Sequence, residues 1–362
     1  MKAKRAMIAM SGGVDSSVAA LLMQEQGYDC AGITMRLCHN RLLPEQQESV
    51  CCSLSDVEDA RSVCLRLNIP FFVYNFTDEF EACVVKDFVD AYARGETPNP
   101  CIVCNRELKF GRLMERARLL GFDTLVTGHY ARTEQDSRTG RWLLKTGLDR
   151  SKDQSYMLYT LTQEQLAYVR FPLGGLTKEE SRALALKADF LNAEKPDSQD
   201  ICFVPDGDYP AFLARYRGRE DEPGDFLTLD GKVCGRHRGQ EAYTVGQRRG
   251  LRLAMGEPVY VIRKNAAENT VTVGPDEALY SSSLIADRVS WIVPQPVGRP
   301  FFAEAKTRYR QPPVPVSAVW SEDQRLHLHF ERPVRAITPG QAVVLYDGDT
   351  VLGGGTILSS QM

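Results

Sequence analysis

The sequence predicts an α/β protein with a parallel sheet domain first, then a small central domain and a C-terminal β-barrel. In the first part of the chain, apolar runs of strand length alternate with helical patterns, which is typical of a parallel sheet covered by helices. After about Tyr209, glycine, proline and β-branched residues become more frequent and helical periodicity fades. From Phe301 onward, short strands separated by turns predict a small barrel. We expect the three domains at 1–208, 209–290 and 291–362.

Local signals predict the N-terminal elements. Ser55 and Glu58 have the spacing of a capping box that opens a helix. Thr162 and Thr177, each followed three residues later by Gln or Glu, predict the caps of two further helices. A hairpin turn is expected near 137–140. Strands are expected at 6–10, 30–35, 71–74 and 124–127, and helices at 18–23, 78–94 and 105–120.

The second half of the chain has the pattern of short strands. The runs 258–262 and 270–273 flank a polar segment and predict a hairpin. The proline-rich stretch 293–298 predicts an irregular linker. Later strands are expected at 316–320, 326–330 and 343–346.

Bulk properties exclude several classes of protein. The chain has 362 residues, so more than one domain is expected. The net charge of −3 does not indicate nucleic-acid binding, although a local basic patch stays possible. No apolar run approaches the ~18 residues of a membrane span. The basic N-terminus leads directly into a glycine-rich loop, which argues against a signal peptide, so we expect a cytoplasmic protein without a membrane anchor.

The segment Ser11-Gly12-Gly13-Val14-Asp15-Ser16-Ser17 lies between the first strand and the first helix. A glycine-rich turn that leads into a helix N-terminus builds an anion cradle from backbone N–H groups. No Lys follows in the G-x-x-x-x-G-K-[ST] pattern, so this is not a Walker loop. The sequence therefore predicts a phosphate site of another kind.

Ten cysteines in a long chain without a signal peptide argue against a secreted disulfide scaffold. Cys30, Cys64 and Cys83 lie in apolar patterns and are expected in the core. Cys101 and Cys104 form a Cys-x-x-Cys before the helix expected at 105–120. At a helix N-terminus and near basic residues, Cys104 would present a thiolate. The pair alone fits a redox pair, half of a zinc site or part of an iron–sulfur ligand set.

Four more segments carry polar or reactive side chains. Asp197-Ser198-Gln199-Asp200-Ile201-Cys202 is a polar turn with one cysteine, and Gly128-His129-Tyr130 ends a strand, where ligands bind in open α/β sheets. The other two are Lys152-Asp153-Gln154-Ser155-Tyr156 and Lys306-Thr307-Arg308-Tyr309-Arg310-Gln311.

The loop at 11–17 resembles the PP-loop of ATP pyrophosphatases, which cleave ATP between its α and β phosphates. All these segments together closely resemble the tRNA-specific 2-thiouridylase family, from Ser11 to Gly353-Gly354-Gly355. The resemblance implies a PP-loop adenylation domain, a central domain and a C-terminal β-barrel. It also implies ATP, Mg²⁺, tRNA and a persulfide sulfur donor or relay protein. The implied reaction thiolates C2 of the wobble uridine through an adenylated intermediate.

The resemblance also assigns roles to residues. Cys202 would carry the persulfide and Cys104 would be the nucleophile, either attacking C2 or reducing the persulfide, and both routes end in a transient Cys104–Cys202 disulfide. Asp15 would help to organise Mg²⁺. The remaining contacts are Ala9, Met10, Ser11, Gly12, Gly13, Val14, Asp15, Ser16, Met35 and Gly128 for ATP, Asn99, Pro100 and Cys101 for the target base, and Lys152, Asp153, Gln154, Arg308 and Tyr309 for tRNA.

Cys101 departs from a well-known form of the family, which has Asp at this position as a general acid or base. Here Cys101 could act as a base, as a bystander, or with Cys104 and Cys202 as a ligand of a [4Fe–4S] cluster. The adjacent Cys51 and Cys52 are expected to be bystanders. Two other readings stay open. An amidotransferase-linked PP-loop synthetase would not require Cys104 and Cys202, and a non-catalytic tRNA-binding module would tolerate loss of Asp15.

Overall fold

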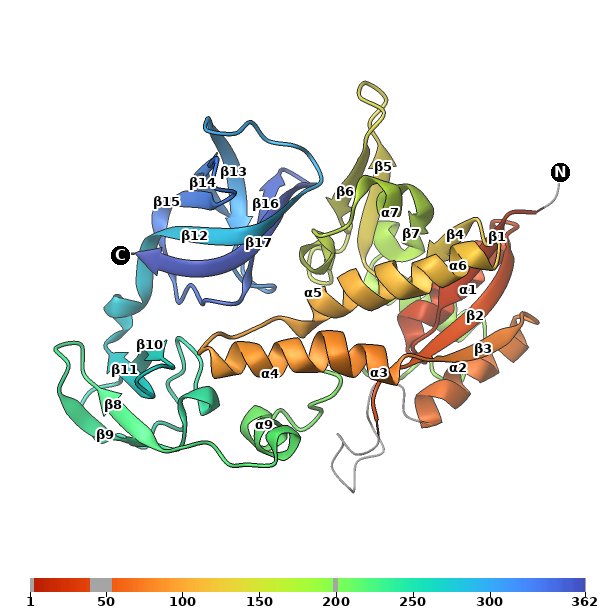
Figure 1. Ribbon diagram of the computed structural model, residues 1–362. Helices are drawn as coiled ribbons and strands as arrows, with labels where there is room; N and C mark the ends of the chain where they lie inside the picture. The colour runs from red at the N-terminus through yellow and green to blue at the C-terminus, as the bar shows by residue number, and fades with distance from the viewer. Residues whose placement is uncertain (1–2, 40–53, 198–200, 362) are drawn as a thin grey trace. The chain divides into compact units, whose positions relative to one another are not determined.

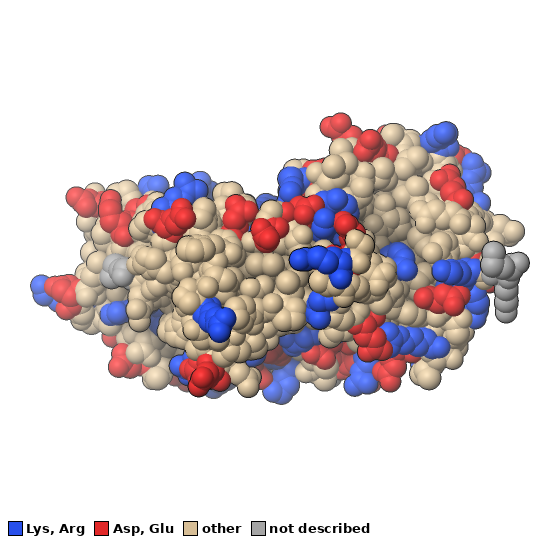
Figure 2. Space-filling view, turned by 90° about the horizontal axis from the view of Figure 1, so that it is seen from above, with Lys and Arg blue, Asp and Glu red and all other residues tan. Residues whose placement is uncertain are grey.

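The computed structural model describes residues 3–39, 54–197 and 201–361. Its contacts divide the chain into two units (Figure 1). The first unit comprises Met1–Val85, Pro100–Gly207 and Asp349–Val351, and the second comprises Lys86–Asn99, Asp208–Gly348 and Leu352–Met362. On the face shown in Figure 2, Lys and Arg side chains are interspersed with Asp and Glu, in keeping with the small net charge of −3. None of the helices in the described ranges is long and apolar enough to cross a membrane.

The first unit is built on a five-stranded parallel sheet of order β3-β2-β1-β4-β7. The strands β2 and β4 flank β1, so the strand order reverses at β1. In open α/β sheets, ligands bind beyond the carboxyl ends of the strands at such a switch point. The strands are β1 (Arg5–Ala9), β2 (Asp29–Arg36), β3 (Phe71–Asn75), β4 (Thr124–Val126) and β7 (Val169–Arg170).

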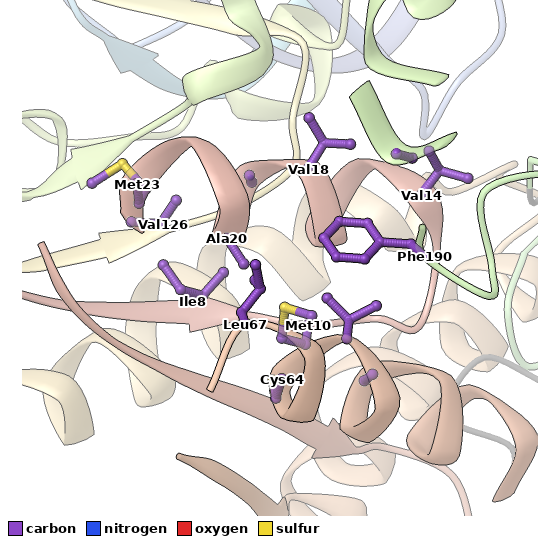
Figure 3. Close-up of a cluster of buried hydrophobic side chains, with 14 of the residues drawn as sticks. Ile8, Met10, Val14, Val18, Ala20, Met23, Cys64, Leu67, Val126 and Phe190 are labelled. Atoms are coloured by element: carbon purple, nitrogen blue, oxygen red, sulfur yellow. The ribbon is translucent and has the colours of Figure 1, made fainter. Parts of the chain in front are cut away.

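An apolar layer between the sheet and α1 (Val14–Glu25) fixes the loop that joins them. Alternate residues of β1 and its end, Ala6, Ile8 and Met10, share one buried cluster with Val18 of α1. Figure 3 shows Ile8 and Met10 beneath α1, with side chains of α2 (Leu54–Arg66) on the lower side. Each fully buried aliphatic side chain contributes roughly 1.5–3 kcal/mol. The cluster therefore holds the start of α1 firmly at the end of β1.

Two helical runs contain π-helical segments. The first is α3 (Thr77–Phe80), Glu81–Val85 and α4 (Lys86–Ala93), and the second is α5 (Pro100–Cys104), Asn105–Leu113 and α6 (Met114–Leu119). The expected helix start near Asn105 is wrong, because Pro100 already opens the run. Proline suits the first helical position, where its missing N–H has no partner to lose. Cys83 is half-buried rather than part of the core.

Capping predictions gave mixed results. Thr162 and Thr177 cap α7 (Gln163–Tyr168) and α8 (Lys178–Lys187) with full capping boxes, as predicted. The cap predicted at Ser55 is wrong, because α2 already includes Leu54. The predicted hairpin is confirmed as β5 (Ala131–Gln135) and β6 (Trp142–Thr146).

The second unit begins its central part with α9 (Tyr209–Arg217), a helix that the sequence analysis did not predict. The Asp208 side chain caps it by accepting from the backbone N–H of Ala211 at 3.1 Å. Phe212 packs against Phe88 of α4 at 6.1 Å between ring centroids. A four-stranded sheet of order β10-β11-β8-β9 follows, with β8 (Gly224–Leu227), β9 (Val233–His237), β10 (Tyr260–Asn265) and β11 (Thr270–Gly274).

The predicted C-terminal β-barrel is confirmed. Its strands run in the order β12-β15-β14-β13-β16-β17, and pairing of β12 with β17 closes it. Alternate side chains such as Val316, Ala318 and Leu328 fill its interior. The strands are β12 (Tyr280–Trp291), β13 (Pro300–Lys306), β14 (Val314–Trp320), β15 (Leu326–Arg335), β16 (Ala342–Asp347) and β17 (Thr350–Gln361).

Candidate active site

The glycine-rich loop leads from the switch-point strand β1 into the N-terminus of α1. Gly13 is the N-cap and has no side chain to cap the first-turn amides, which stay available to an anion. Gly12 has a φ of +77°, and a Cβ there would lie 2.3 Å from the Asp56 carbonyl oxygen. Only glycine fits this position without displacing α2. The loop therefore has the geometry of a phosphate cradle.

Serine hydroxyls stabilise the loop from within. The Ser16 hydroxyl accepts from the Ser11 backbone N–H at 3.1 Å and donates to the Gly13 carbonyl at 3.1 Å. The Ser17 hydroxyl donates to the same carbonyl at 3.0 Å. Ser16 and Ser17 are buried, whereas Ser11 is exposed. We conclude that Ser16 and Ser17 shape the loop and that Ser11 faces the open side.

Two residues that the sequence analysis did not select hold the loop from outside. Asn192 donates from Nδ2 to the Gly12 carbonyl at 2.9 Å and to the Ser17 hydroxyl at 3.0 Å. The Lys195 ammonium lies 2.6 Å from both Asp56 and Asp59 of α2. No sequence signal marked either residue, since their partners lie more than a hundred positions away in the chain.

Asp15 is the charged side chain of the glycine-rich loop itself, in the first turn of α1. Its Oδ1 accepts from the Tyr130 hydroxyl at 2.9 Å and from the Lys178 ammonium at 2.7 Å. The Asp15 side chain is 33% exposed. A Cβ at Gly128, where β4 ends, would lie 2.7 Å from the Ser16 backbone nitrogen. The structure thus brings Gly128 and Tyr130 against the loop.

Asp197, which lies five positions before Cys202 in the sequence, continues this network. Its carboxylate lies 2.7 Å from the Lys178 ammonium, 2.8 Å from that of Lys152 and 3.2 Å from the Arg182 guanidinium. Burial alone would raise the pKa of Asp197, but the hydrogen bonds from Lys152 and Lys178 hold that pKa below its usual range. A continuous series of ion pairs therefore links Asp15 to Lys152.

In the segment Lys152-Asp153-Gln154, two of the three side chains bond to the protein's own backbone. Asp153 is buried and accepts from the backbone N–H groups of Gly147 and Ser155, each at 3.1 Å. The Gln154 amide oxygen accepts from the backbone N–H of Tyr130 at 3.0 Å. These bonds make Asp153 and Gln154 supports of the loop, and Lys152 carries the charge that faces Asp197.

The two cysteines of Cys-x-x-Cys have opposite surroundings. Cys101 is exposed, whereas Cys104 is buried, with 8% of its surface exposed. The expectation of an exposed Cys104 thiolate is therefore wrong. The helical run begins at Pro100, so Cys104 lies a full turn inside it. Asn105 donates from Nδ2 to the Met157 carbonyl at 3.0 Å and ties this turn to the segment after Gln154. Asn99 belongs to the second unit.

Cys202 is half-buried, and its neighbour Phe203 packs edge-to-face on Phe80 at 5.6 Å. Among the described residues, which include Cys101, Cys104 and Cys202, no three His, Cys, Asp or Glu side chains form a group that could hold a metal. The ligand set of a [4Fe–4S] cluster is therefore not assembled, and the cluster alternative is not supported. Cys51 and Cys52 lie outside the described residues, as do Ser198, Gln199 and Asp200.

Cys30, Cys64 and Met35 are buried in the first unit, and His129 is half-buried there. Burial raises the pKa of the Cys30 thiol to about 11 and that of Cys64 to about 12, as expected for core residues. Met35 is buried on β2. His129 packs against the rings of Phe110 and Phe171, and burial, followed by the charge of Lys109, lowers the pKa of His129. His129 is therefore neutral at physiological pH.

Arg308 and Tyr309 lie in the second unit. One terminal nitrogen of Arg308 donates to the carbonyls of Val245 at 3.2 Å and Ala336 at 2.7 Å, and to the Thr338 hydroxyl at 2.9 Å. The Lys306 ammonium lies 5.9 Å from the centre of the Tyr309 ring. Arg308 thus has an internal bonding role whatever else it contacts.

Comparison with known proteins gives matches along nearly the whole chain. Family models match at residues 4–206 (tRNA methyl transferase HUP domain), 210–275 (tRNA methyl transferase PRC-barrel domain) and 281–357 (Aminomethyltransferase beta-barrel domain). The tRNA-specific 2-thiouridylase MnmA of Geotalea uraniireducens is 52% identical over 98% of this chain and 95% of its own length. That of Heliobacterium modesticaldum is 50% identical over 97% and 92%.

Solved structures give weaker matches. NMN synthetase from Francisella tularensis matches with a TM-score of 0.34 and 17% identity, over 61% of this chain and 79% of its own. A predicted subunit of tRNA methyltransferase from Methanocaldococcus jannaschii matches with a TM-score of 0.32 and 16% identity, over 60% and 89%.

Proposed function

The chain belongs to the tRNA-specific 2-thiouridylase family and is a tRNA-uridine 2-sulfurtransferase, and from this premise we propose which residues carry out adenylation and which carry out sulfur transfer. ATP adenylates the C2 oxygen of the wobble uridine at the glycine-rich loop, and Cys202 and Cys104 then supply sulfur. The uncapped amides at Gly13 beside Asp15 are the observation that carries this proposal.

Adenylation converts a poor leaving group into a good one. The uridine O2 attacks the α phosphorus of ATP, the bond between the α phosphorus and its bridging oxygen breaks, and pyrophosphate leaves; the N3 proton passes to solvent. Backbone amides at a helix N-terminus stabilise the charge that develops on the departing phosphates. We assign this role to the loop from Ala9 to Ser16, with Met35 and Gly128 on the nucleoside side.

The residues present fit a nucleotide-bound Mg²⁺. Mg²⁺ in ATP sites commonly takes one or two carboxylates together with phosphate oxygens and water. Asp15 supplies one partly exposed carboxylate, and Oδ1 is already shared by Tyr130 and Lys178. Bound Mg²⁺ would neutralise phosphate charge. Tyr130 and Lys178 orient the Asp15 carboxylate, and burial raises the pKa of Tyr130, so its hydroxyl stays protonated and donates.

Sulfur transfer uses the two cysteines. A sulfur donor converts Cys202 to a persulfide, whose terminal sulfur replaces the adenylated oxygen at C2 as AMP leaves. The Cys104 thiolate attacks the inner sulfur of Cys202, the bond between the inner and terminal sulfurs breaks, the terminal sulfur stays on C2, and a Cys104–Cys202 disulfide forms. In the alternative route, Cys104 first attacks the inner sulfur of the persulfide, which forms the same disulfide and releases sulfide, and this sulfide displaces AMP from C2. A thiol reductant must then reduce that disulfide before the next cycle.

The proposed contacts with tRNA come from two segments of the first part of the chain and from the C-terminal barrel. We propose that Asn99, Pro100 and Cys101 lie near the target base and that Lys152 contacts the RNA backbone. Asp153 and Gln154 would contribute by holding Lys152 in place, since their side chains bond inward. Arg308 and Tyr309 would contact the tRNA elsewhere, by phosphate pairing and base stacking.

The test of the nucleotide site is the substitution Asp15→Asn. It keeps the size of the side chain but removes the charge, so tRNA-dependent release of pyrophosphate from ATP should fall at least tenfold. Asp189→Asn is the matched control, because Asp189 is exposed and has a φ of +58° that asparagine also tolerates. Equal rates for the two variants would overturn the assignment of Asp15.

A further inference from the structure

Lys178 has an unusual place in the sequence of its helix. It follows the N-cap Thr177 directly and is the first residue of α8. A cation in the first helical turn opposes the helix dipole. Lys178 is also buried, with 8% of its surface exposed. Burying an ammonium group requires charged partners.

Those partners are two carboxylates from distant parts of the first unit. The Lys178 ammonium lies 2.7 Å from Asp15 Oδ1 and 2.7 Å from Asp197 Oδ1. It also lies 5.9 Å from the centre of the Tyr130 ring, which itself donates to Asp15. The ammonium is thus fixed on three sides.

The proposed function connects one carboxylate with adenylation and the other with the cysteine that carries sulfur. Asp15 lies in the first turn of α1 at the glycine-rich loop, and Asp197 lies five positions before Cys202. Within the described part of the chain, Lys178 is the cation whose ion pairs reach both. Lys152 and Arg182 also neutralise Asp197, but their recorded ion pairs do not include Asp15.

We infer that Lys178 is a positioning residue that sets the orientation of Asp15 and holds Asp197, five positions before Cys202 in the sequence, by ion pairs from one ammonium group. This inference rests on the proposed function, which gives Asp15 to adenylation and Cys202 to sulfur transfer. Loss of the ammonium leaves Asp15 paired with the Tyr130 hydroxyl, and it removes one of the bonds that anchor Asp197. Both halves of the reaction depend on the same side chain.

The test compares Lys178→Met with Lys178→Arg, and uses Lys187→Met as the control in the exposed last turn of the same helix. Two rates are measured: alkylation of Cys202 by iodoacetamide, followed by peptide mass spectrometry, and tRNA-dependent release of pyrophosphate from ATP. For Lys178→Met, we expect several-fold faster alkylation and at least tenfold slower pyrophosphate release. Lys178→Arg should restore part of both, and Lys187→Met should match the wild type.

The buried thiols of Cys30 and Cys64 report in the same experiment whether the fold is intact, because they react only on unfolding. If Lys178→Met does not fold, Lys178→Gln replaces it, with the same two expected changes. A folded Lys178→Met protein with either rate unchanged would overturn the inference. Wild-type protein that releases no pyrophosphate would instead overturn the proposed function, and Cys202 alkylation would still decide the role of Lys178.

Discussion

Burial separates the two cysteines that the proposed mechanism pairs. Cys104 is buried one turn inside its helix, whereas Cys202 is half-buried beside Phe203. An accessible sulfur suits the residue that must receive sulfur from a donor, and a buried thiol suits one that reacts only with a partner inside the protein. The difference in exposure therefore supports the persulfide role for Cys202.

Substituting either cysteine should stop thiolation but not adenylation. Cys202→Ser and Cys104→Ser should each abolish 2-thiouridine formation, while pyrophosphate release with tRNA stays within a few-fold of the wild type. The reason is that the adenylation groups lie at the glycine-rich loop. Nucleoside analysis by mass spectrometry measures the product. Cys234→Ser, in β9, serves as the control, and near-normal 2-thiouridine from either of the first two variants would refute the assignment.

Cys101 is exposed and is not part of an assembled metal-ligand set in the described chain. We expect Cys101→Ser to keep thiolation within a few-fold of the wild-type rate, since the two-cysteine mechanism does not use this thiol. Protein prepared without oxygen should contain no stoichiometric iron. Loss of activity in Cys101→Ser, when the wild type holds no iron, would favour a base role for Cys101. Iron that is bound to the wild type and lost together with activity in Cys101→Ser would support the cluster.

Arg308 combines an internal role with the proposed tRNA contact. Arg308→Ala removes hydrogen bonds to Val245, Ala336 and Thr338, so the free energy of unfolding should fall by about 1–2 kcal/mol. If a phosphate contact is also lost, the slope of log affinity for tRNA against log salt should become shallower by roughly one unit. Exposed Arg310→Ala is the control. An unchanged salt slope would leave Arg308 with its structural role alone.

Between α4 and β10 of the second unit lies a buried cation. The Lys264 ammonium lies 5.5 Å from the centre of the Tyr92 ring, and no hydrogen-bond partner is recorded for it among the described residues. Burial lowers the pKa of Lys264 from 10.5 to about 8, against the opposing charges of Glu241 and Glu96. The packing of these two elements thus carries a cost whenever Lys264 is protonated.

This cost predicts a pH dependence of stability. Below pH 8 both folded and unfolded chains hold the Lys264 proton, and above it the folded chain releases the proton first, so the unfolded state binds more protons. The free energy of unfolding should therefore rise by about 1–2 kcal/mol between pH 8 and 9.5. Chemical denaturation at each pH measures it. Lys264→Met should remove most of this rise, and an equal rise in that variant would contradict the prediction.

Features of the fold could be predicted correctly where the sequence signal lies within a few neighbouring residues. The capping boxes at Thr162 and Thr177 and the apolar run of β1 are local patterns, and the structure confirms them. The helix α9 was missed because the surrounding glycine and proline content masked a nine-residue pattern. Lys178 was missed because its partner Asp15 lies 163 positions away, and only the fold brings them together.

Site residues that belong to a short, contiguous motif were easier to assign than residues whose surroundings depend on packing. The glycine-rich loop is recognisable because backbone geometry demands glycine at Gly12. The exposure of Cys104 could not be predicted, since it depends on where the helix begins. The expected domain limits at 1–208, 209–290 and 291–362 stay predictions, as do the roles assigned to the site residues.

The central claim is that the C2 oxygen of the target uridine leaves as part of AMP. The direct measurement uses tRNA carrying ¹⁸O at C2 of the wobble uridine, incubated with the protein, ATP and a persulfide donor. Mass spectrometry of the products should find the label in AMP, in an amount equal to the 2-thiouridine formed, with unlabelled pyrophosphate. Label recovered in water or pyrophosphate, or thiolation without labelled AMP, would contradict the account.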